Sequence, residues 1–550
     1  MKKRNPKTRK RQQDSKFQRE ERRSYEESRK QPDTGVNDFS WYNRNPQLTV
    51  AAASLPFPYR PGMTVGSLIY DSNAPTLIGS RFTIPGVMAL DWIPTLGQSA
   101  TALDPASLAA KEIYAKVRSV YSGSLDADAP DFMIYLMALD SIFSYIGYWK
   151  RIYRILNAYS PSNYQTPDSI LAAMGLEEEQ ATALRNNRAQ LLYNINELIG
   201  MTRKFKCPAV FDVFNRHYWM NDNVYTDDAS INSQFYLFNQ KAFYQFYLEE
   251  IESGVHAGGL RAIRFVPSTI EAMYTFGKNL IDALASSEDG YTISGYLTRA
   301  YQDVPNFSVD DLMGSEVFTP MYEPSVLQQI ENSCGVMPSE LFMKTADTVE
   351  NNIINSNNIS QKPATNAIIS TPTAPMGDTT TSDYWILKPA LNIRSDQPSV
   401  IDVIEASRLA AYIDPNEMVS VKNYKVYCGT ELPLRWRFYT NNLSSTFGRV
   451  ASALVPGWAV EQSQRWVVAD DSDSLSGVNT DAVLPLMFMS NFDWAPRIVV
   501  RMQKGNPATS ADKFAEYLFW DVHNLTTFEL DQMKQINRVC LLSEFNSFNV

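Results

Sequence analysis

The residues best suited to a chemical task are the basic side chains that crowd the N-terminus. Residues 1–30 contain 13 Lys or Arg and five Asp or Glu, a net charge of +8. Lysine and arginine neutralise phosphate groups, so a dense basic run of this kind is typical of a nucleic-acid-binding arm. The predicted phosphate-binding residues are Lys2, Lys3, Arg4, Lys7, Arg9, Lys10, Arg11, Lys16, Arg19, Arg22 and Arg23.

We expect this arm to be disordered. Its only large apolar residues through position 30 are Met1, Phe17 and Tyr25, too few to offset the entropy lost on ordering. The first eleven residues are the stronger candidates, because acidic residues dilute the second half of the arm. A solvated tail or a nuclear-localisation patch explains the same composition, and we weigh these evenly against RNA or DNA binding.

The rest of the chain has the opposite charge and a globular composition. The full 550 residues carry a net charge of −10, so the part after residue 30 carries −18. Hydrophobic residues make up 44% and charged residues 20%, which supplies ample material for a core. At roughly 150 residues per domain, this length predicts about three to four domains.

A search for catalytic residues gives little. The chain has only three histidines. His217 lies among aromatic residues and is more typical of a buried core histidine than of a catalytic one. His256 precedes Gly258-Gly259, which predicts a turn, and His523 is expected at a strand end. Phosphate-binding glycine loops and a nucleophile elbow are missing, so we predict no catalytic residue, no metal site and no cofactor.

The cysteines and the most apolar stretch indicate the redox compartment and whether the chain spans a membrane. The four cysteines are far apart, which argues against a zinc ribbon or a dense disulfide framework. The N-terminus lacks the apolar core of a secretory signal, so we expect a reducing compartment. Residues 132–149 are apolar on nearly all sides but contain Asp140 and Ser141 at their centre. They therefore predict a buried core helix rather than a membrane span.

The positions of proline and glycine predict where helices and extended segments begin and end. Asp104-Pro105 should start a helix that stops by Gly123. Further helices are expected from Pro130 to about Tyr159, from Thr166-Pro167 to Gly175, and over about 177–205. Residues 55–100 should be extended, because many prolines and glycines interrupt them. Strands are expected at 432–439, 465–468 and 497–502, so the fold class is α+β.

Two stretches have an unusual composition. Residues 235–247 contain seven aromatic side chains, which we attribute to core packing in preference to a subunit interface. In residues 351–382, 19 of 32 are Asn, Ser, Thr or Pro, which predicts an exposed, irregular loop or linker.

Several segments resemble the capsid proteins of picobirnaviruses in their order and spacing. The similar motifs are Trp41-Tyr42-Asn-Arg44-Asn-Pro46, Leu55-Pro-Phe57, Thr83-Ile-Pro-Gly-Val-Met88, Pro94-Thr-Leu-Gly97, Tyr135-Leu-Met-Ala-Leu-Asp-Ser141, Arg216-His217-Tyr-Trp-Met220, Ile404-Glu405-Ala406, Phe492-Asp-Trp-Ala-Pro496 and Thr526-Thr-Phe-Glu529. They cover roughly residues 40–220 and 400–530. The middle of the chain, about 255–400, has no motif of this kind.

The resemblance implies a viral coat protein that assembles as dimers into a small icosahedral shell around segmented double-stranded RNA. It implies a structural protein rather than an enzyme, although some members of the family remove their own N-terminal segment. Its partners would be further copies of itself, viral RNA and the viral polymerase, with no stable insertion into a membrane. It would be found in the virion, and in the host cytoplasm during assembly.

The expected fold is a predominantly helical shell domain, a more irregular, β-containing projecting region and a disordered basic arm. The expected division is an RNA-binding arm at 1–37, a helical shell region at 38–254, a projecting region at 255–400 and a mixed shell region at 401–550. Two alternatives stay open. One is a cellular RNA-binding scaffold protein with a basic tail, and the other is a coat protein that removes its arm by autoproteolysis.

Overall fold

A computed structural model describes residues 39–57, 64–66, 81–84, 86–160, 165–230, 232–252, 255–337, 346–375, 389–420, 423–439, 459–462, 466–467, 491–504, 512–518, 521–527 and 529–546. The chain divides into two units, Met1–Pro58 and Tyr59–Val550, and each is described on its own. The basic arm lies outside the described residues.

Helices and strands alternate along the second unit. Its helices are α3 (Pro105–Val120), α4 (Ala129–Asn157), α5 (Gln165–Ala173), α6 (Glu178–Asn186), α7 (Arg188–Thr202), α8 (Asp212–Asp222), α9 (Ile270–Ala285), α10 (Glu288–Ala300), α11 (Pro324–Glu331), α12 (Ala346–Ser356), α13 (Val400–Ser407) and α15 (Leu530–Glu544). Its strands are β1 (Thr64–Gly66), β2 (Arg81–Thr83), β3 (Val87–Pro94), β4 (Tyr225–Thr226), β5 (Phe235–Gln240), β6 (Ala242–Glu252), β7 (Val255–Arg264), β8 (Ile359–Lys362), β9 (Ala367–Ser370), β10 (Thr373–Pro375), β11 (Ala390–Ile393), β12 (Tyr412–Ser420), β13 (Asn423–Tyr427), β14 (Glu431–Tyr439), β15 (Ala459–Gln462), β16 (Trp466–Val467), β17 (Ile498–Lys504), β18 (Asp512–Leu518) and β19 (Asn524–Thr527). The predicted α+β class is confirmed.

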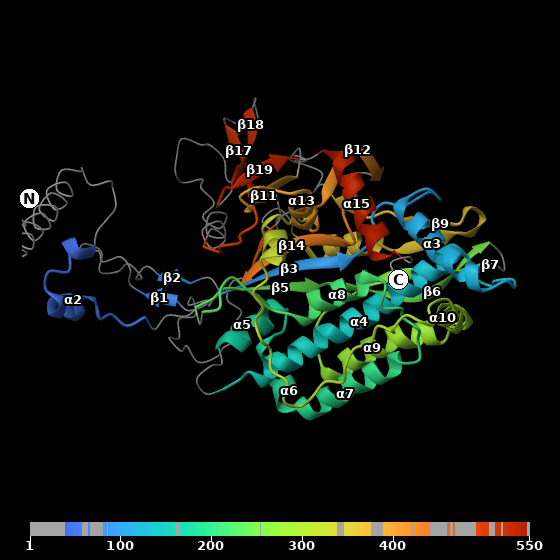
Figure 1. The fold of residues 1–550 in the computed structure, drawn as a ribbon, viewed down its shortest axis with the longest axis horizontal. Coiled ribbons are helices and arrows are strands. Elements are labelled where there is room, and N and C mark those ends of the chain that lie inside the picture. The colour runs from blue at the N-terminus through green and yellow to red at the C-terminus, as the bar shows by residue number, and fades with distance from the viewer. Residues whose placement is uncertain are drawn as a thin grey trace, which may run out of the picture. The chain divides into compact units, whose positions relative to one another are not determined.

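Helix α4 is the central element of this unit. It has a proline in its first turn, as predicted, and the structure adds a capping box at Asp128. Nearly all of its side chains are buried, and it packs against α3, α7, α8, α9 and β6. Figure 1 shows α4, α7 and α9 running together on one side of β3 and β5. An all-round apolar helix needs neighbours on every side, and here it has them.

Several polar side chains inside α4 find partners in other elements, whereas the buried Ser144 hydroxyl has no hydrogen-bond partner among the described residues. The Ser141 hydroxyl accepts a hydrogen bond of 2.8 Å from the backbone N–H of Tyr244. The Lys150 ammonium donates to the carbonyl of Asp310 at 2.8 Å. Arg151 is buried and donates to the carbonyl of Phe238 at 2.8 Å. The helix is long and apolar enough to cross a membrane, but its most apolar window is 100% buried within the protein, so it is a core helix as predicted.

Strand β3 lies at the centre of the main sheet, whose order is β15-β14-β3-β5-β4. It pairs with β5 in parallel and with β14 antiparallel. All eight of its residues are buried, because the sheet is covered on both faces. Val87, Ala89 and Ile93 face the core around α4, and the alternate residues face a second apolar cluster that includes α11.

The aromatic stretch at 235–247 forms β5 and the start of β6. Most of these rings, including those of Phe238 and Phe243, are buried within the chain. Phe243 packs edge-to-face on Tyr145 of α4, with ring centroids 5.1 Å apart. The core interpretation of this stretch is therefore confirmed, and these rings are not free to form a subunit interface.

The turn predicted at His256 is wrong. His256, Gly258 and Gly259 all lie within β7, which pairs along its length with β6 in the four-stranded sheet β6-β7-β8-β9. The rings of Phe246 and Tyr247 lie across the two glycines, where an added Cβ would meet them at 3.1 Å and 2.9 Å. Glycine here makes room for rings from the neighbouring strand and does not mark a turn.

The loop predicted over 351–382 is also wrong wherever the structure describes it. Residues 346–375 form α12, β8, β9 and β10. The polar residues act as internal partners, since the buried Asn357 side chain donates to the carbonyl of Pro94 at 2.6 Å. Asn358, in an apparent glycosylation sequon, accepts from the backbone N–H of Ala262 at 2.9 Å. Residues 376–382 lie outside the described part.

The single helix predicted over 177–205 is two helices. Asn187 ends α6 and begins α7, with φ −113° and ψ 33°. Its side-chain amide donates to the carbonyl of Ala183 at 2.9 Å and so competes with the helical backbone. The predicted helices at α3, α4 and α5 and the strands at β14, β16 and β17 are confirmed.

The first unit is described over residues 39–57. It contains a short 3-10 helix (Phe39–Trp41) and helix α2 (Pro46–Ala53), which Asn45 caps by accepting from the backbone N–H of Leu48 at 3.2 Å. No side chain of α2 is buried. The exposed large apolar residues of this unit, here called the exposed apolar segment, are Phe39, Trp41, Tyr42, Leu48, Val50, Leu55 and Phe57.

The proposed boundary at residue 254 falls between two paired strands. β6 ends at Glu252, β7 begins at Val255, and the two strands form one hairpin. Further along, α9 packs on α4 and contributes Met273 and Leu280 to the main core. The described residues of 255–375 thus share a core with α4. That part of residues 255–400 projects from a shell stays a prediction.

Candidate functional site

His217 lies at the centre of a buried network of charges. Its Nδ1 is 2.7 Å from Asp140 Oδ2 of α4, and its Nε2 is 3.5 Å from Glu431 Oε1 of β14. The Trp92 ring packs beside the imidazole, with centroids 5.0 Å apart. The side chain is 0% exposed. The prediction of a buried core histidine is confirmed, and the ring has no access to a substrate.

The same network continues to the C-terminal helix. Glu431 pairs with Arg216 of α8, and its Oε1 is 3.1 Å from Nη2 of Arg408, which follows α13. Arg408 also pairs with Glu544 at the end of α15. Three carboxylates therefore face two guanidiniums and one imidazole, and the network joins five segments that are far apart in the sequence.

Burial and pairing oppose each other in setting the pKa values of this network. Burial lowers the pKa of His217, but Asp140 and Glu431 outweigh it and raise that pKa to about 9. Burial also acts to raise the pKa of Glu431, yet Arg216 and Arg408 hold it well below its usual range. At neutral pH the imidazole is therefore protonated and acts as a structural cation.

A second buried network holds β3 to β14. Asp91 Oδ2 is 3.0 Å from Arg435 Nε, and its Oδ1 is 2.7 Å from Arg437 Nη2. Arg435 also reaches Glu350 of α12 at 2.7 Å, and Arg264 of β7 reaches the same carboxylate at 2.9 Å. Although burial opposes it, the positive charges of Arg437, Lys241 and Arg435 keep the pKa of Asp91 far below normal. This network explains how α12 is fixed on the sheet.

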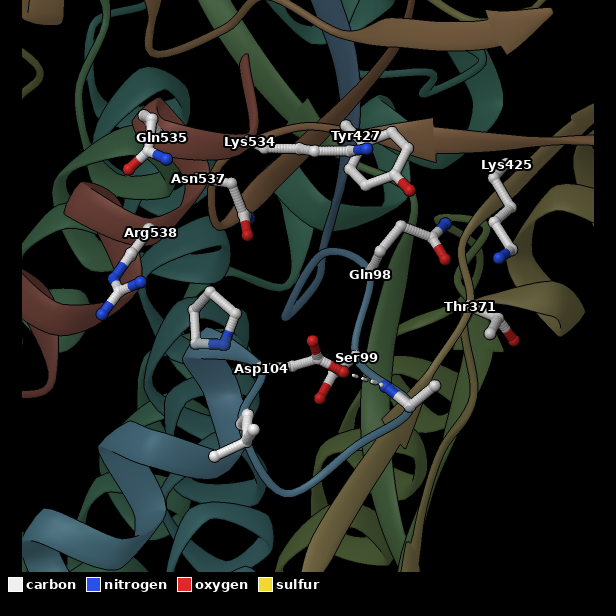
Figure 2. A pocket seen from close by; sticks show the side chains of 13 residues that line it. Gln98, Ser99, Asp104, Thr371, Lys425, Tyr427, Lys534, Gln535, Asn537 and Arg538 are labelled. Carbon is white, nitrogen blue, oxygen red and sulfur yellow. Dashed lines mark hydrogen bonds between the residues drawn. The ribbon is translucent and has the colours of Figure 1, made fainter. Parts of the chain in front are cut away.

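The remaining candidate is a pocket of about 420 Å³ between α15, β13 and the loop that precedes α3. Figure 2 shows its labelled side chains around a central opening. Its lining residues are Gln98, Ser99, Ala100, Leu103, Asp104, Pro105, Thr371, Lys425, Tyr427, Lys534, Gln535, Asn537 and Arg538. Three of these are cations and one is a carboxylate, so the pocket is basic.

Hydrogen bonds fix the walls of this pocket. The Gln98 amide donates to the carbonyls of Pro372 and Val426 at 2.6 and 2.9 Å. Gly97 turns the loop with φ +64°, a conformation that favours glycine, and a Cβ there would collide with the Asn537 side chain. Asp104 accepts from the backbone N–H groups of Ala100 and Thr101 at 2.8 and 2.6 Å. The site is therefore formed before any ligand arrives.

None of the eleven predicted phosphate-binding residues falls in the described part of the chain, so the arm stays a prediction. The basic pocket was missed by sequence reasoning. Its signal was present but weak: Lys534 and Arg538 are four residues apart in a helix with no acid four residues from either. Asp140 gave a clearer signal, because a lone carboxylate in an apolar helix must be paired. Among the described residues, no cluster of His, Cys, Asp or Glu is placed to hold a metal.

Comparisons with known proteins point in one direction. Residues 41–430 match the model of the picobirnavirus capsid protein family. The chain is 28% identical over 313 residues to a capsid protein precursor of human picobirnavirus (strain Human/Thailand/Hy005102/-). That match covers 54% of this chain and 54% of the relative, so the alignment spans about half the relative's length.

The fold comparison agrees with the sequence comparison. An X-ray structure of the picobirnavirus capsid matches with a TM-score of 0.74 and 22% sequence identity. The match covers 93% of this chain and 99% of that chain, so it includes the middle region in which the sequence carries no recognised motif. At this identity the likeness shows the fold, and the family match shows the membership. The chain belongs to the picobirnavirus capsid protein family and is a structural protein of the virion.

Proposed function

We propose that this protein assembles as dimers into a small icosahedral shell that encloses segmented double-stranded RNA. The observation that carries the proposal is the family match over 41–430 together with a whole-chain likeness to a capsid subunit. Electron microscopy of the purified protein tests it. Uniform closed shells are expected, and a preparation that contains only small oligomers would favour a cellular scaffold protein instead.

Self-association needs a surface that the sequence features do not supply. The aromatic stretch at 235–247 and the apolar helix α4 are both buried inside one chain. Support comes instead from the exposed apolar segment and from Val400 and Ile401 of α13, which are 81% and 68% exposed. Apolar surface of this kind usually marks a contact with another molecule. Light scattering of disassembled particles should give roughly twice 62.2 kDa.

The basic arm is the proposed RNA-binding element. A charge of +8 on residues 1–30 contrasts with −18 on the rest of the chain, so the arm can hold phosphate while the body stays soluble. Binding should be independent of base sequence, because phosphate contacts carry no base information.

Replacing Lys2, Lys3, Arg4, Lys7, Arg9, Lys10 and Arg11 with Gln should lower the RNA content of purified particles. The ratio of absorbance at 260 and 280 nm measures this content. A variant that keeps these seven residues in scrambled order is the matched control and should package normally. If the Gln variant packages as much RNA as the parent, another surface binds the RNA.

Processing of the N-terminal segment is a second candidate activity. The curated relative is described as a precursor, which favours a cleaved form. Mass spectrometry of aged particles should then show one defined truncation. A ladder of products would indicate contaminating protease, and an unchanged mass would exclude processing under those conditions.

The remaining proposals concern layout and partners. We propose that 38–254 and 401–550 contribute to the shell, and that part of 255–400 projects outward. Limited proteolysis of intact particles should cut first within 255–400 under this layout. Association with the viral polymerase and assembly in the host cytoplasm complete the proposal, and co-purification of polymerase with particles tests the first of these.

A further inference from the structure

Two cations on α15 lack the partners that they would normally have. Lys534 and Arg538 lie four residues apart on one face of the helix and both line the basic pocket. Like charges at this spacing repel each other. Within the described part of the chain, neither has a carboxylate at ion-pair distance, and the Lys534 ammonium lies instead 4.9 Å from the centre of the Tyr427 ring.

The opposite side of the pocket adds a third cation. Lys425 of β13 lines it and pairs with Glu417, which is about half exposed. The single carboxylate of the lining, Asp104, already accepts from two backbone N–H groups. Burial and nearby carboxylates raise the pKa of Tyr427 to about 12, so its hydroxyl is neutral and able to donate. With Lys425 paired to Glu417, the lining keeps Lys534 and Arg538 against Asp104, so the pocket offers donors and one positive charge in excess.

We propose that this pocket binds the phosphate groups of a nucleotide or of an RNA strand. Phosphate is favoured because the Arg538 fork and the Lys534 ammonium line one opening and suit an oxyanion, while Lys425 on the opposite side is shared with Glu417. A volume of about 420 Å³ is within the range of small-molecule sites. Because the walls are fixed by hydrogen bonds, little ordering is needed on binding. The site is separate from the N-terminal arm and does not depend on the function proposed above.

The experiment uses the full chain with the eleven predicted phosphate-binding residues of the arm replaced by Gln, so that residues 1–30 carry a net charge of −3 and repel the probes. Tripolyphosphate, ATP and a fluorescent eight-nucleotide single-stranded RNA are the probes, measured by calorimetry and anisotropy. The test variant is Lys534→Gln with Arg538→Gln. The matched control is Arg203→Gln with Lys278→Gln, which removes the same charge from two exposed ion pairs elsewhere.

The test variant should bind each probe at least about tenfold more weakly, since each lost charged hydrogen bond costs about that factor. For the RNA probe, the slope of log affinity against log salt should fall by about 1.4, the value for two phosphate contacts on a single strand. The control should stay within about twofold of the parent. Arg538→Lys keeps the charge but loses the fork, so its affinity should lie between those of the parent and the test variant. Circular dichroism should show the same fold in all variants.

The probes also separate the two sources of phosphate. Tighter binding of ATP than of tripolyphosphate, with no further gain for RNA, identifies a free nucleotide, whereas much tighter RNA binding identifies a strand. Either result supports the site. Equal losses in the test and control variants would overturn the proposal, because binding would then follow net charge alone. Absence of binding by the parent at low salt, or tighter binding of a poly-glutamate peptide than of tripolyphosphate, would also overturn it.

Discussion

Helix α4 and the exposed apolar segment are both rich in apolar residues, yet they end in opposite environments. In α4 nearly every side chain is buried, and its charged residues Asp140, Lys150 and Arg151 have partners in other elements. In residues 39–57, α2 has no buried side chain, and Phe57 is 82% exposed. The comparison shows that an apolar segment favours burial, but its composition does not tell whether the same chain or another molecule buries it. Residues of the same chain bury α4, and we propose that a second copy of the protein buries the exposed apolar segment.

The largest expected effect is at the one acidic residue in the middle of α4. Asp140→Asn removes the carboxylate that pairs with His217 and leaves a buried cation with one partner fewer. Breaking a buried pair of this kind costs about 3–5 kcal/mol. Urea unfolding measures it. The control, Asp282→Asn, breaks an exposed pair with Lys278 on α9 and should cost less than about 1 kcal/mol.

The same substitution at two leucines gives the sharpest test of the comparison. Leu139→Ala in α4 creates a cavity in the core and should lower the free energy of unfolding by about 2–5 kcal/mol. Leu48→Ala in α2, at a side chain that is 66% exposed, should change it by less than about 0.5 kcal/mol. Similar losses at both positions would mean that the exposed segment is part of the folded core.

Stability should also depend on pH through His217. Its pKa is about 9 in the folded protein and about 6.5 in an unfolded chain. The stabilisation is therefore complete below about pH 6.5 and is lost as the pH rises through 9, by up to about 3 kcal/mol. Urea unfolding between pH 6.5 and 9.5 measures it. In His217→Gln this alkaline loss should shrink, and an unchanged slope would place its origin elsewhere.

The smallest expected effect on folding concerns the exposed segment. Replacing Leu48, Val50 and Leu55 together with Ser should change the free energy of unfolding by less than about 0.5 kcal/mol per residue. Assembly should nevertheless fall, because the apolar surface for a second copy is lost. Particle yield on a sucrose gradient measures this, with Val522→Ser as an exposed control. Normal yield would show that another surface joins the subunits.

Helices α3, α4 and α5 were predictable from the sequence, whereas α8 to α13 and α15 were not predicted. Helix α3 begins at a proline, α4 has a proline in its first turn, and the strand β14 carries β-forming residues. These signals are local, and local signals can be read from neighbours in the sequence. The errors came where tertiary contacts reverse a local signal. Gly258 and Gly259 are strand residues because aromatic rings cover them, and Asn357 is buried because it finds a carbonyl far away in the sequence.

The candidate sites also have features that the sequence predicts and features that only the folded structure reveals. By itself the sequence determined the charge contrast between the arm and the body, the central apolar helix and the motifs that resemble the family. Only the tertiary structure decided which charges meet: it placed His217 between Asp140 and Glu431, and it brought Lys425 across from Lys534 and Arg538. The physical reason is that composition and periodicity act over a few residues. Charge pairing acts over a few ångströms between segments that only folding brings together.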